Sequence, residues 1–295
     1  PTSHEGCPVT VTDLEPIVVP PSDRRVARKV VIASFVGTSL ESYDFYVFAY
    51  FSAIFSAPLF FPEQDLAAGT ILSFLLLAMS YLVRPLGAII FGHLGDRIGR
   101  KRTLLWTIGI MGVATGAIGL LPDFAQLGIL APILLAVLRV VQGLSLGGEW
   151  GGSILLATEH AAYRRRGFYA ALPQLGSPVG TILTGALFLL LTLTLSGDDM
   201  LAWGWRLPFL LAFPLLGVSL YLRLAIDETP VFRTLVTTNR RSRTPVLEVF
   251  RSHPFAVLVA IAAALLGIGS YSLMNTYTLA YGVTTLGFSY QELFQ

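Results

Sequence analysis

Seven long apolar segments follow one another along this chain, and they decide what it can fold into. Each has about the 20 residues that a helix needs to cross the hydrocarbon core of a bilayer, or more. Charged residues make up only 13% of the 295-residue chain, against about 25% in soluble domains. We therefore expect an all-α membrane protein. The predicted spans are residues 30–57, 66–92, 103–121, 129–158, 168–195, 205–226 and 255–286.

Lysine and arginine are unevenly distributed between the loops, and this bias predicts the orientation of the protein. Most of the 20 basic residues lie before the first span or after the second, fourth and sixth spans. The opposite loops, residues 58–65, 122–128 and 196–204, contain none. Because cytoplasmic loops carry the excess of positive charge, the N-terminus is predicted to be cytoplasmic. The expected location is the cell (inner or plasma) membrane.

The spans divide the chain into four parts. Residues 1–29 are polar and lack the apolar stretch of a signal peptide, so a disordered cytoplasmic tail is expected. Residues 30–226 hold six spans, and residues 227–254, which are rich in arginine and contain three prolines, are predicted to be a cytoplasmic linker. Residues 255–295 supply a seventh span, which suggests the first helix of a second, missing bundle. Cys7 is the sole cysteine, which excludes an intrachain disulfide and a thiolate metal cluster.

Five ionisable residues lie inside the predicted spans: Glu41, Asp44, Arg84, Arg139 and Glu149. Each costs about 2.5–3.5 kcal/mol at the centre of a membrane, so these groups must form pairs or line a wet cavity. At about 1.5 Å per residue, Asp44 and Arg139 fall at similar depth near the middle of the membrane. Arg84 and Glu149 fall at similar depth nearer the inner side. These depths leave open whether the pairs act in function or only tie helices together.

A motif rich in glycine and arginine connects the second and third spans, from Gly92 to Arg102. Its glycines permit a tight turn between two helices. Asp96 could cap the third helix or bond to a neighbouring helix. The charge rule explains the arginines but not their spacing with glycine and aspartate. We therefore expect a functional role for this loop.

This motif resembles the signature that the major facilitator superfamily carries between its second and third helices. Leu138-Arg139-Val140-Val141-Gln142-Gly143 in the fourth span resembles the second motif of that superfamily. Other segments resemble the metabolite:proton symporter family, whose members include shikimate, α-ketoglutarate, citrate and proline/betaine permeases. These segments are Glu41–Phe45, Arg84–Gly87, Gly147–Gly152, Trp203–Phe209 and Glu228–Phe232.

The resemblance implies a major-facilitator-type six-helix bundle, built from two three-helix repeats, plus one further transmembrane helix. Family members have twelve spans, so the chain is expected to be truncated and to lack its C-terminal half. The implied function is proton-coupled symport of a small organic acid or zwitterion by alternating access. A proton gradient would drive it, with no cofactor and no nucleic-acid partner. Gly176, Pro178 and Gly180 resemble an antiporter signature, which leaves antiport or facilitative transport open.

The resemblance also implies roles for particular residues. Asp44, with Glu41 as a second candidate, would carry the proton, and Arg139 would contact a carboxylate of the cargo or act on a carboxyl group. Arg84, Glu149 and Tyr43 are further candidates for proton coupling or substrate binding. Gln142 and Gly143 complete the fourth-helix motif with Arg139. Residues of the loop after the second span are expected to control switching between inward- and outward-facing states: Gly92, Asp96, Arg97, Gly99 and Arg100.

Enzymes and other membrane proteins are the alternative readings. Gly143-Leu144-Ser145-Leu146-Gly147 matches a hydrolase pattern, but that pattern needs a strand–turn–helix elbow and here lies inside an apolar span. Both lysines follow an arginine, so a Gly-Lys phosphate loop is absent from the sequence. We therefore expect no enzyme. A seven-helix receptor usually has its N-terminus outside the cell, which disagrees with the predicted orientation. A channel remains an alternative function.

Overall fold

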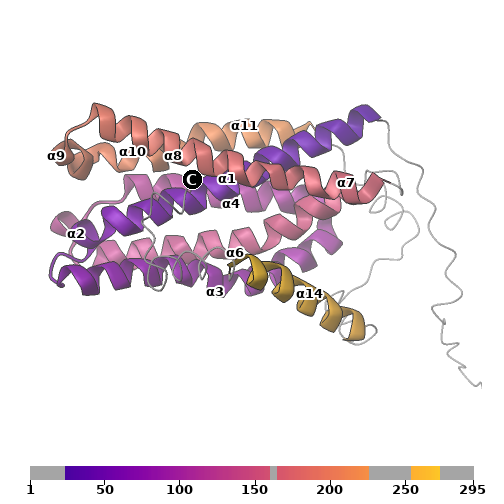
Figure 1. Ribbon diagram of the computed structural model, residues 1–295, viewed down its shortest axis with the longest axis horizontal. Helices are drawn as coiled ribbons and strands as arrows, with labels where there is room; N and C mark the ends of the chain where they lie inside the picture. Colours follow the sequence, from indigo (N-terminus) through magenta and orange to yellow (C-terminus); the bar gives the residue numbers. More distant parts are fainter. Residues whose placement is uncertain (1–23, 160–164, 226–253, 273–295) are drawn as a thin grey trace, which may run out of the picture. The chain divides into compact units, whose positions relative to one another are not determined.

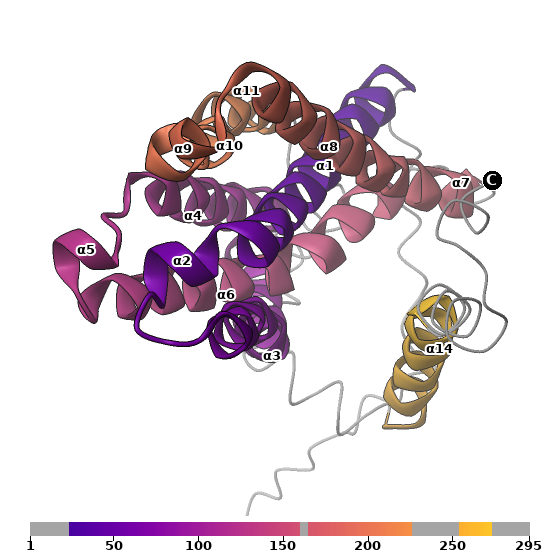
Figure 2. The same cartoon turned by 60° about the vertical axis from the view of Figure 1, so that its left-hand side comes forward.

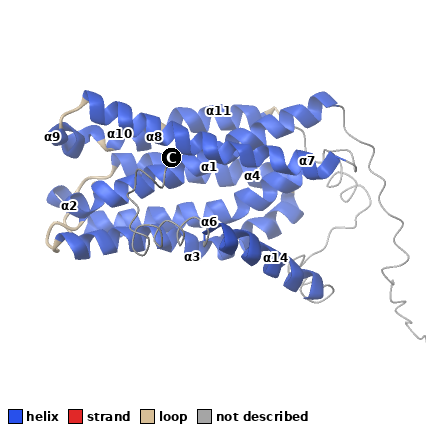
Figure 3. Cartoon of the chain, in the orientation of Figure 1, coloured by secondary structure: helices blue, strands red, loops and turns tan. Residues whose placement is uncertain are grey.

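The structure, a computed structural model, describes residues 24–159, 165–225 and 254–272. Throughout these residues the regular structure is helical, which confirms the predicted all-α class (Figure 3). Most of the predicted tail, nearly all of the predicted linker and the end of the seventh span lie outside the described residues. The chain divides into two units, residues 1–241 and 242–295. Each unit is described by itself.

The first unit contains the helices of the predicted six-helix bundle. In chain order they are α1 (Arg24–Ile54), α2 (Ser56–Phe60), α3 (Leu66–Ile98), α4 (Arg100–Leu120), α5 (Phe124–Leu127), α6 (Leu130–Glu159), α7 (Arg166–Ala171), the 3-10 turn η3 (Leu172–Leu175), α8 (Gly176–Thr194), α9 (Gly197–Asp199), the π-helical turn η4 (Met200–Gly204), α10 (Arg206–Leu210) and α11 (Ala212–Leu224). In the second unit, α14 (Pro254–Ser272) begins one residue before the predicted start of the seventh span.

Five helical stretches among the described residues are long and apolar enough to cross a membrane. They are Ala67–Ile98, Arg100–Leu120, Leu130–Thr158, Arg166–Thr194 and Gly197–Leu224. α1 has sufficient length, at 31 residues, but it is less apolar because the polar residues 41–44 lie in its middle. It also begins at Arg24, six residues before the predicted boundary of the N-terminal tail.

The connection between α3 and α4 is much shorter than the predicted loop. α3 continues to Ile98 and α4 begins at Arg100, so Gly99 alone joins them. Gly99 has a φ of 109°, a conformation that residues with a Cβ rarely adopt. Gly92, by contrast, lies within α3. Of the two glycines expected to permit this turn, only Gly99 does so, because one residue of positive φ suffices to reverse the chain.

Contacts between the helices follow a two-fold pattern. α3 packs along α6, α1 packs along α8, and α4 packs against α11 (Figure 2). If α1, α3 and α4 are exchanged with α6, α8 and α11, the α3–α6 contact becomes the α8–α1 contact. The α4–α11 contact maps onto itself. Such symmetry is typical of transporters built from structural repeats, and it agrees with the predicted pair of three-helix repeats.

Glycines let α3 and α6 approach closely. A Cβ added at Gly143 would overlap the carbonyl oxygen of Ser80, and one added at Gly87 would overlap the carbonyl oxygen of Leu144. Gly147 also faces the α3 backbone directly. Small residues at such crossings bring helix backbones together in lipid. The glycine of the fourth-helix motif therefore has a packing role.

The two ends of the bundle differ in character. α2 and α9 lie at one end and α7 at the other (Figure 1). Near α2, aromatic rings form a buried core in which the ring centroid of Phe51 lies 5.0 Å from that of Trp205 and 5.3 Å from that of Phe209. At the other end, the ammonium group of Lys101 donates a 2.8 Å hydrogen bond to the carbonyl of Leu224. This bond joins the start of α4 to the end of α11, at what we call the basic end.

We predict that Gly143→Ala destabilises the bundle, because its methyl group would meet the backbone of α3. Overpacking of this kind costs about 1–3 kcal/mol, so the apparent Tm in detergent should fall. Gly217→Ala is the matched control, because a Cβ at Gly217 meets nothing within 4 Å and alanine favours helix by about 1 kcal/mol. Equal melting temperatures for the two variants would contradict close packing at Gly143.

Candidate functional site

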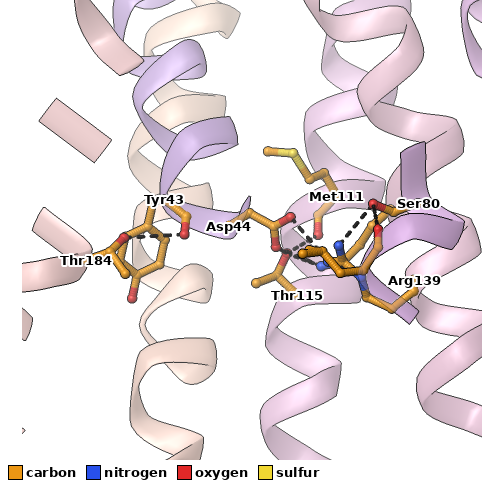
Figure 4. Close-up of polar contacts among 9 residues, drawn as sticks. Tyr43, Asp44, Ser80, Met111, Thr115, Arg139 and Thr184 are labelled. Atoms are coloured by element: carbon orange, nitrogen blue, oxygen red, sulfur yellow. Dashed lines mark hydrogen bonds and ion pairs between the residues drawn. The ribbon is translucent and has the colours of Figure 1, made fainter. Parts of the chain in front are cut away.

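Asp44 of α1 and Arg139 of α6 lie close together inside the bundle (Figure 4). Arg139 Nη1 is 3.9 Å from Asp44 Oδ2, and Gln142 connects the two residues. The Gln142 amide nitrogen donates to Asp44 Oδ1 at 2.7 Å, and its oxygen accepts from Arg139 Nη1 at 2.7 Å. The similar depth of Asp44 and Arg139 in the membrane thus predicts this pair correctly. Gln142, which bridges the pair, belongs to the same fourth-helix motif as Arg139.

Side chains from two further helices complete this network. Thr115 of α4 donates to Asp44 Oδ1, and Ser80 of α3 accepts a 3.0 Å hydrogen bond from Arg139 Nη2. The guanidinium of Arg139 also lies 3.8 Å from the ring centroid of Phe48, a cation–π contact. We call Asp44, Gln142, Arg139, Thr115 and Ser80 the central network. It joins α1, α3, α4 and α6.

The central network is closed to solvent. Asp44 is 2% exposed, Arg139 is 1% exposed and Gln142 is fully buried. The two carboxylate oxygens of Asp44 differ, because Oδ1 accepts from Gln142 and Thr115 while Oδ2 has no hydrogen-bond partner. A proton added to Oδ2 would therefore break none of these hydrogen bonds.

Glu149 forms a second buried ion pair, with Arg223 of α11. The pair is 1% and 3% exposed, and Glu149 Oε2 accepts a 2.9 Å hydrogen bond from Thr107. The expected pairing of Glu149 with Arg84 is therefore wrong. Gly37 of α1 makes room for the pair, because a Cβ there would overlap the Arg223 guanidinium. Removing one partner of such a buried pair typically costs 3–5 kcal/mol.

Arg223 is not among the five ionisable residues that the sequence predicts inside the spans. It lies in the last turn of α11, yet its side chain points into the bundle and not toward water. At about 1.5 Å per residue, Arg223 falls about 5 Å from the inner end of the predicted span 205–226, and Glu149 falls about 14 Å from the inner end of its own span. Depth along the spans therefore does not predict this pair.

Glu41 and Arg84 occupy a more open position. Both are half-buried, and their opposite charges attract each other. The guanidinium of Arg84 lies 4.2 Å from the ring centroid of Tyr81. Tyr43 does not join them, because its hydroxyl donates a 2.6 Å hydrogen bond to the carbonyl of Pro208. Tyr43 thus ties α1 to α10 and points away from the central network (Figure 4).

The motif at the α3–α4 turn forms an exposed ion pair. Arg100 Nη2 lies 3.2 Å from Asp96 Oδ1, and both side chains are partly exposed. Asp96 does not cap α4. The N-cap residue of α4 is Gly99, and no side-chain hydrogen bond caps this end of the helix. Arg97 belongs to the last turn of α3. The motif therefore lies at the basic end of the bundle, away from the central network.

Metal binding finds no support in the part of the chain that the structure describes. No group of three or more His, Cys, Asp or Glu side chains there could hold a metal ion.

Curated proteins of similar sequence are bacterial transporters. The inner membrane metabolite transport protein YhjE of Escherichia coli (strain K12) is 40% identical over 263 residues, which are 89% of this chain and 58% of that protein. The shikimate transporter of the same organism is 38% identical, over 91% of this chain and 61% of its own length. The glycine betaine/proline/ectoine/pipecolic acid transporter OusA of Dickeya dadantii (strain 3937) is 36% identical, over 89% of this chain and 54% of its own length. This chain spans little more than half the length of these relatives.

Solved structures of the xylose transporter XylE share the fold. A partially occluded inward-open conformation of the Escherichia coli protein has a TM-score of 0.62 at 16% identity, over 84% of this chain and 61% of that one. XylE bound to 6-bromo-6-deoxy-D-glucose has a TM-score of 0.63 at 16% identity, over 76% of this chain and 49% of that one.

The family described as sugar (and other) transporter matches residues 29–253. The match covers the whole helical bundle, and the helices have the arrangement found in a major facilitator protein. The resemblance seen in the sequence is confirmed: this chain belongs to the sugar (and other) transporter family of the major facilitator superfamily.

Proposed function

We propose that this chain is part of a secondary active transporter that moves a small organic acid or zwitterion together with a proton by alternating access. The buried contact of Asp44, Gln142 and Arg139 is the observation that carries this proposal. Support comes from relatives described as metabolite, shikimate and glycine betaine/proline transporters. A structural neighbour is described as a proton:xylose symporter. Transport, and not catalysis of a reaction, is the proposed activity.

Asp44 is the proposed proton carrier. A carboxylate in the membrane interior is unfavourable unless donors stabilise it, and Gln142, Thr115 and Arg139 supply that stabilisation. Protonation at Oδ2 would remove the charge and leave the hydrogen bonds on Oδ1 in place. Because Asp44 is only 2% exposed here, proton exchange requires the bundle to open to water. Alternating access would provide that opening on each side in turn.

Arg139 acts on Asp44 and not directly on the cargo in this proposal. Its guanidinium is held by Gln142 and Ser80 and is 1% exposed, so a carboxylate could reach it only after rearrangement. Half-buried Glu41 and Arg84 offer one negative and one positive group on the more open side. Cargo that engages them would alter the field at Asp44. By linkage, cargo and proton would then influence each other's binding reciprocally.

Antiport finds less support from the geometry. The glycines that resemble an antiporter signature, Gly176 and Gly180, lie directly against the backbone of α1 at Phe35 and Ser39. Close packing of α8 on α1 therefore accounts for both of them.

We predict that Asp44→Asn in the full-length protein abolishes accumulation driven by a pH gradient, because the titrating group is lost while shape is nearly preserved. Exchange of labelled for unlabelled cargo should persist. The measurement is uptake into vesicles with and without an imposed gradient, using whichever labelled acid or zwitterion the intact protein accumulates best. Asp123→Asn is the matched control, because Asp123 only caps α5. Gradient-driven accumulation by Asp44→Asn would reduce Asp44 to a structural residue.

Asp96→Asn is expected to slow transport several-fold while cargo affinity at equilibrium stays nearly unchanged. The reason is position: the Asp96–Arg100 pair joins the ends of α3 and α4 at the basic end, away from the central network. Transport rate and equilibrium binding should be measured on the same preparation. Asp198→Asn changes an exposed aspartate of α9 and serves as control. A large loss of affinity at a normal rate would place Asp96 in binding.

The basic end is proposed to face the cytoplasm, because it carries the excess of arginine. Cysteines replacing Arg102 and Ala125 test this in a Cys7→Ser background, since both positions are exposed and lie in α4 and α5. A membrane-impermeant maleimide should label position 125 in intact cells and position 102 only after permeabilisation. The reverse pattern would invert the topology.

A further inference from the structure

An apolar groove follows the outward face of α4, with walls from α6 and α11. It has a volume of about 510 Å³ and its lining is almost entirely apolar. We call it the α4 groove. Its lining includes Trp106, Gly109 and Val113 of α4, Leu138 of α6, and Leu216 and Leu220 of α11.

The groove is open to the surroundings of the bundle. Trp106 is 63% exposed and Val113 is 55% exposed. Gly109 recesses the floor, because a Cβ there would meet nothing within 4 Å. α4 is among the helices that are long and apolar enough to cross a membrane. The medium that fills such a groove is therefore lipid, and its shape suits a chain that lies lengthwise.

The dimensions of the groove match one leaflet. Its lining on α4 runs from Leu105 to Ala117, about 18 Å at 1.5 Å per residue. One leaflet contributes about 15 Å, half of a hydrocarbon core of about 30 Å. An acyl chain that enters from the basic end would fill the groove without passing far into the other leaflet.

Positive charge lies at the mouth of the groove. Lys101 and Arg102 occupy the first turn of α4, and Arg102 is exposed. The hydrogen bond from Lys101 to the carbonyl of Leu224 holds its ammonium group between α4 and α11, two of the three walls. Basic side chains at a membrane surface attract anionic lipids. Trp106 lies about one turn further along, where tryptophan favours the membrane interface.

We propose that the α4 groove binds one anionic phospholipid, with an acyl chain in the groove and its phosphate near Lys101 and Arg102. One residue of the groove lining also contacts the interior of the bundle. Leu216 lines both the α4 groove and the small internal pocket that Asp44 also lines. A bound chain would hold in place the side chain that separates lipid from that pocket. The proposal rests on the groove and the basic end and does not depend on which cargo is carried.

Native mass spectrometry of the 295-residue chain tests the site, with phosphatidylglycerol and phosphatidylcholine as probes. We expect one phosphatidylglycerol to be retained, and at least tenfold less by Gly109→Leu, whose side chain fills the groove. Gly185→Leu is the matched control, because Gly185 also lies in a helix with nothing within 4 Å of its Cβ position, but it lies outside the groove. Lys101→Gln with Arg102→Gln should abolish the preference for phosphatidylglycerol. Equal retention by the two leucine variants, or of the two lipids, would overturn the proposal and indicate ordinary annular lipid only.

Fluorescence quenching provides a second readout in vesicles, where detergent cannot strip the lipid. Phosphatidylglycerol with brominated acyl chains should quench Trp106 at least twofold more than brominated phosphatidylcholine at equal content. The contribution of Trp106 is the signal lost in Trp106→Phe. Gly109→Leu should remove the difference between the lipids, and Gly185→Leu should keep it. Absence of quenching would mean that protein covers the groove, and the proposal would fail.

Discussion

A charge inside a membrane-spanning bundle is stable only where donors or an opposite charge reach it, and the packing of this bundle is arranged around that constraint. Asp44 and Arg139 come from different helices, and each has a hydrogen-bond partner on a third helix, Thr115 of α4 for Asp44 and Ser80 of α3 for Arg139. Gly143 and Gly147 let α6 approach the backbone of α3, which brings Ser80 within reach of Arg139. Without these glycines the helices would stand further apart, and the central network would lose the hydrogen bond between Arg139 and Ser80.

The two buried ion pairs differ in how firmly they are held. Glu149 contacts Arg223 directly and is further bonded by Thr107, so its charge is tightly compensated. Asp44 meets Arg139 only at 3.9 Å, through the amide of Gln142, and keeps one oxygen free of hydrogen bonds. A tightly compensated pair suits a structural link between α6 and α11. A looser pair with a free oxygen suits a group that gains and loses a proton.

α4 serves both the interior and the exterior of the bundle. Thr107 and Thr115 face inward to the two buried carboxylates, while Gly109 and Val113 line the outward groove. Because a helix turns about 100° per residue, positions two apart face opposite sides. Changes at the lipid-facing surface of α4 are thus only one helix diameter from the central network, and Leu216 of α11 reaches between them.

The amino-acid sequence alone is sufficient to predict the helical membrane fold, because lipid offers no hydrogen bonds to a backbone and forces it into helices. It also predicts which charged residues lie at the same depth in the membrane, because depth follows from the rise per residue. In this way it predicts the pairing of Asp44 with Arg139. Three features became apparent from the folded bundle alone: Glu149 pairs with Arg223 and not with Arg84, Gln142 bridges the central pair, and Tyr43 points to Pro208. Those choices depend on how each helix is rotated about its axis and on which helices are neighbours. Rotation and lateral neighbours come from side-chain packing across the whole bundle, which spacing along one segment does not contain.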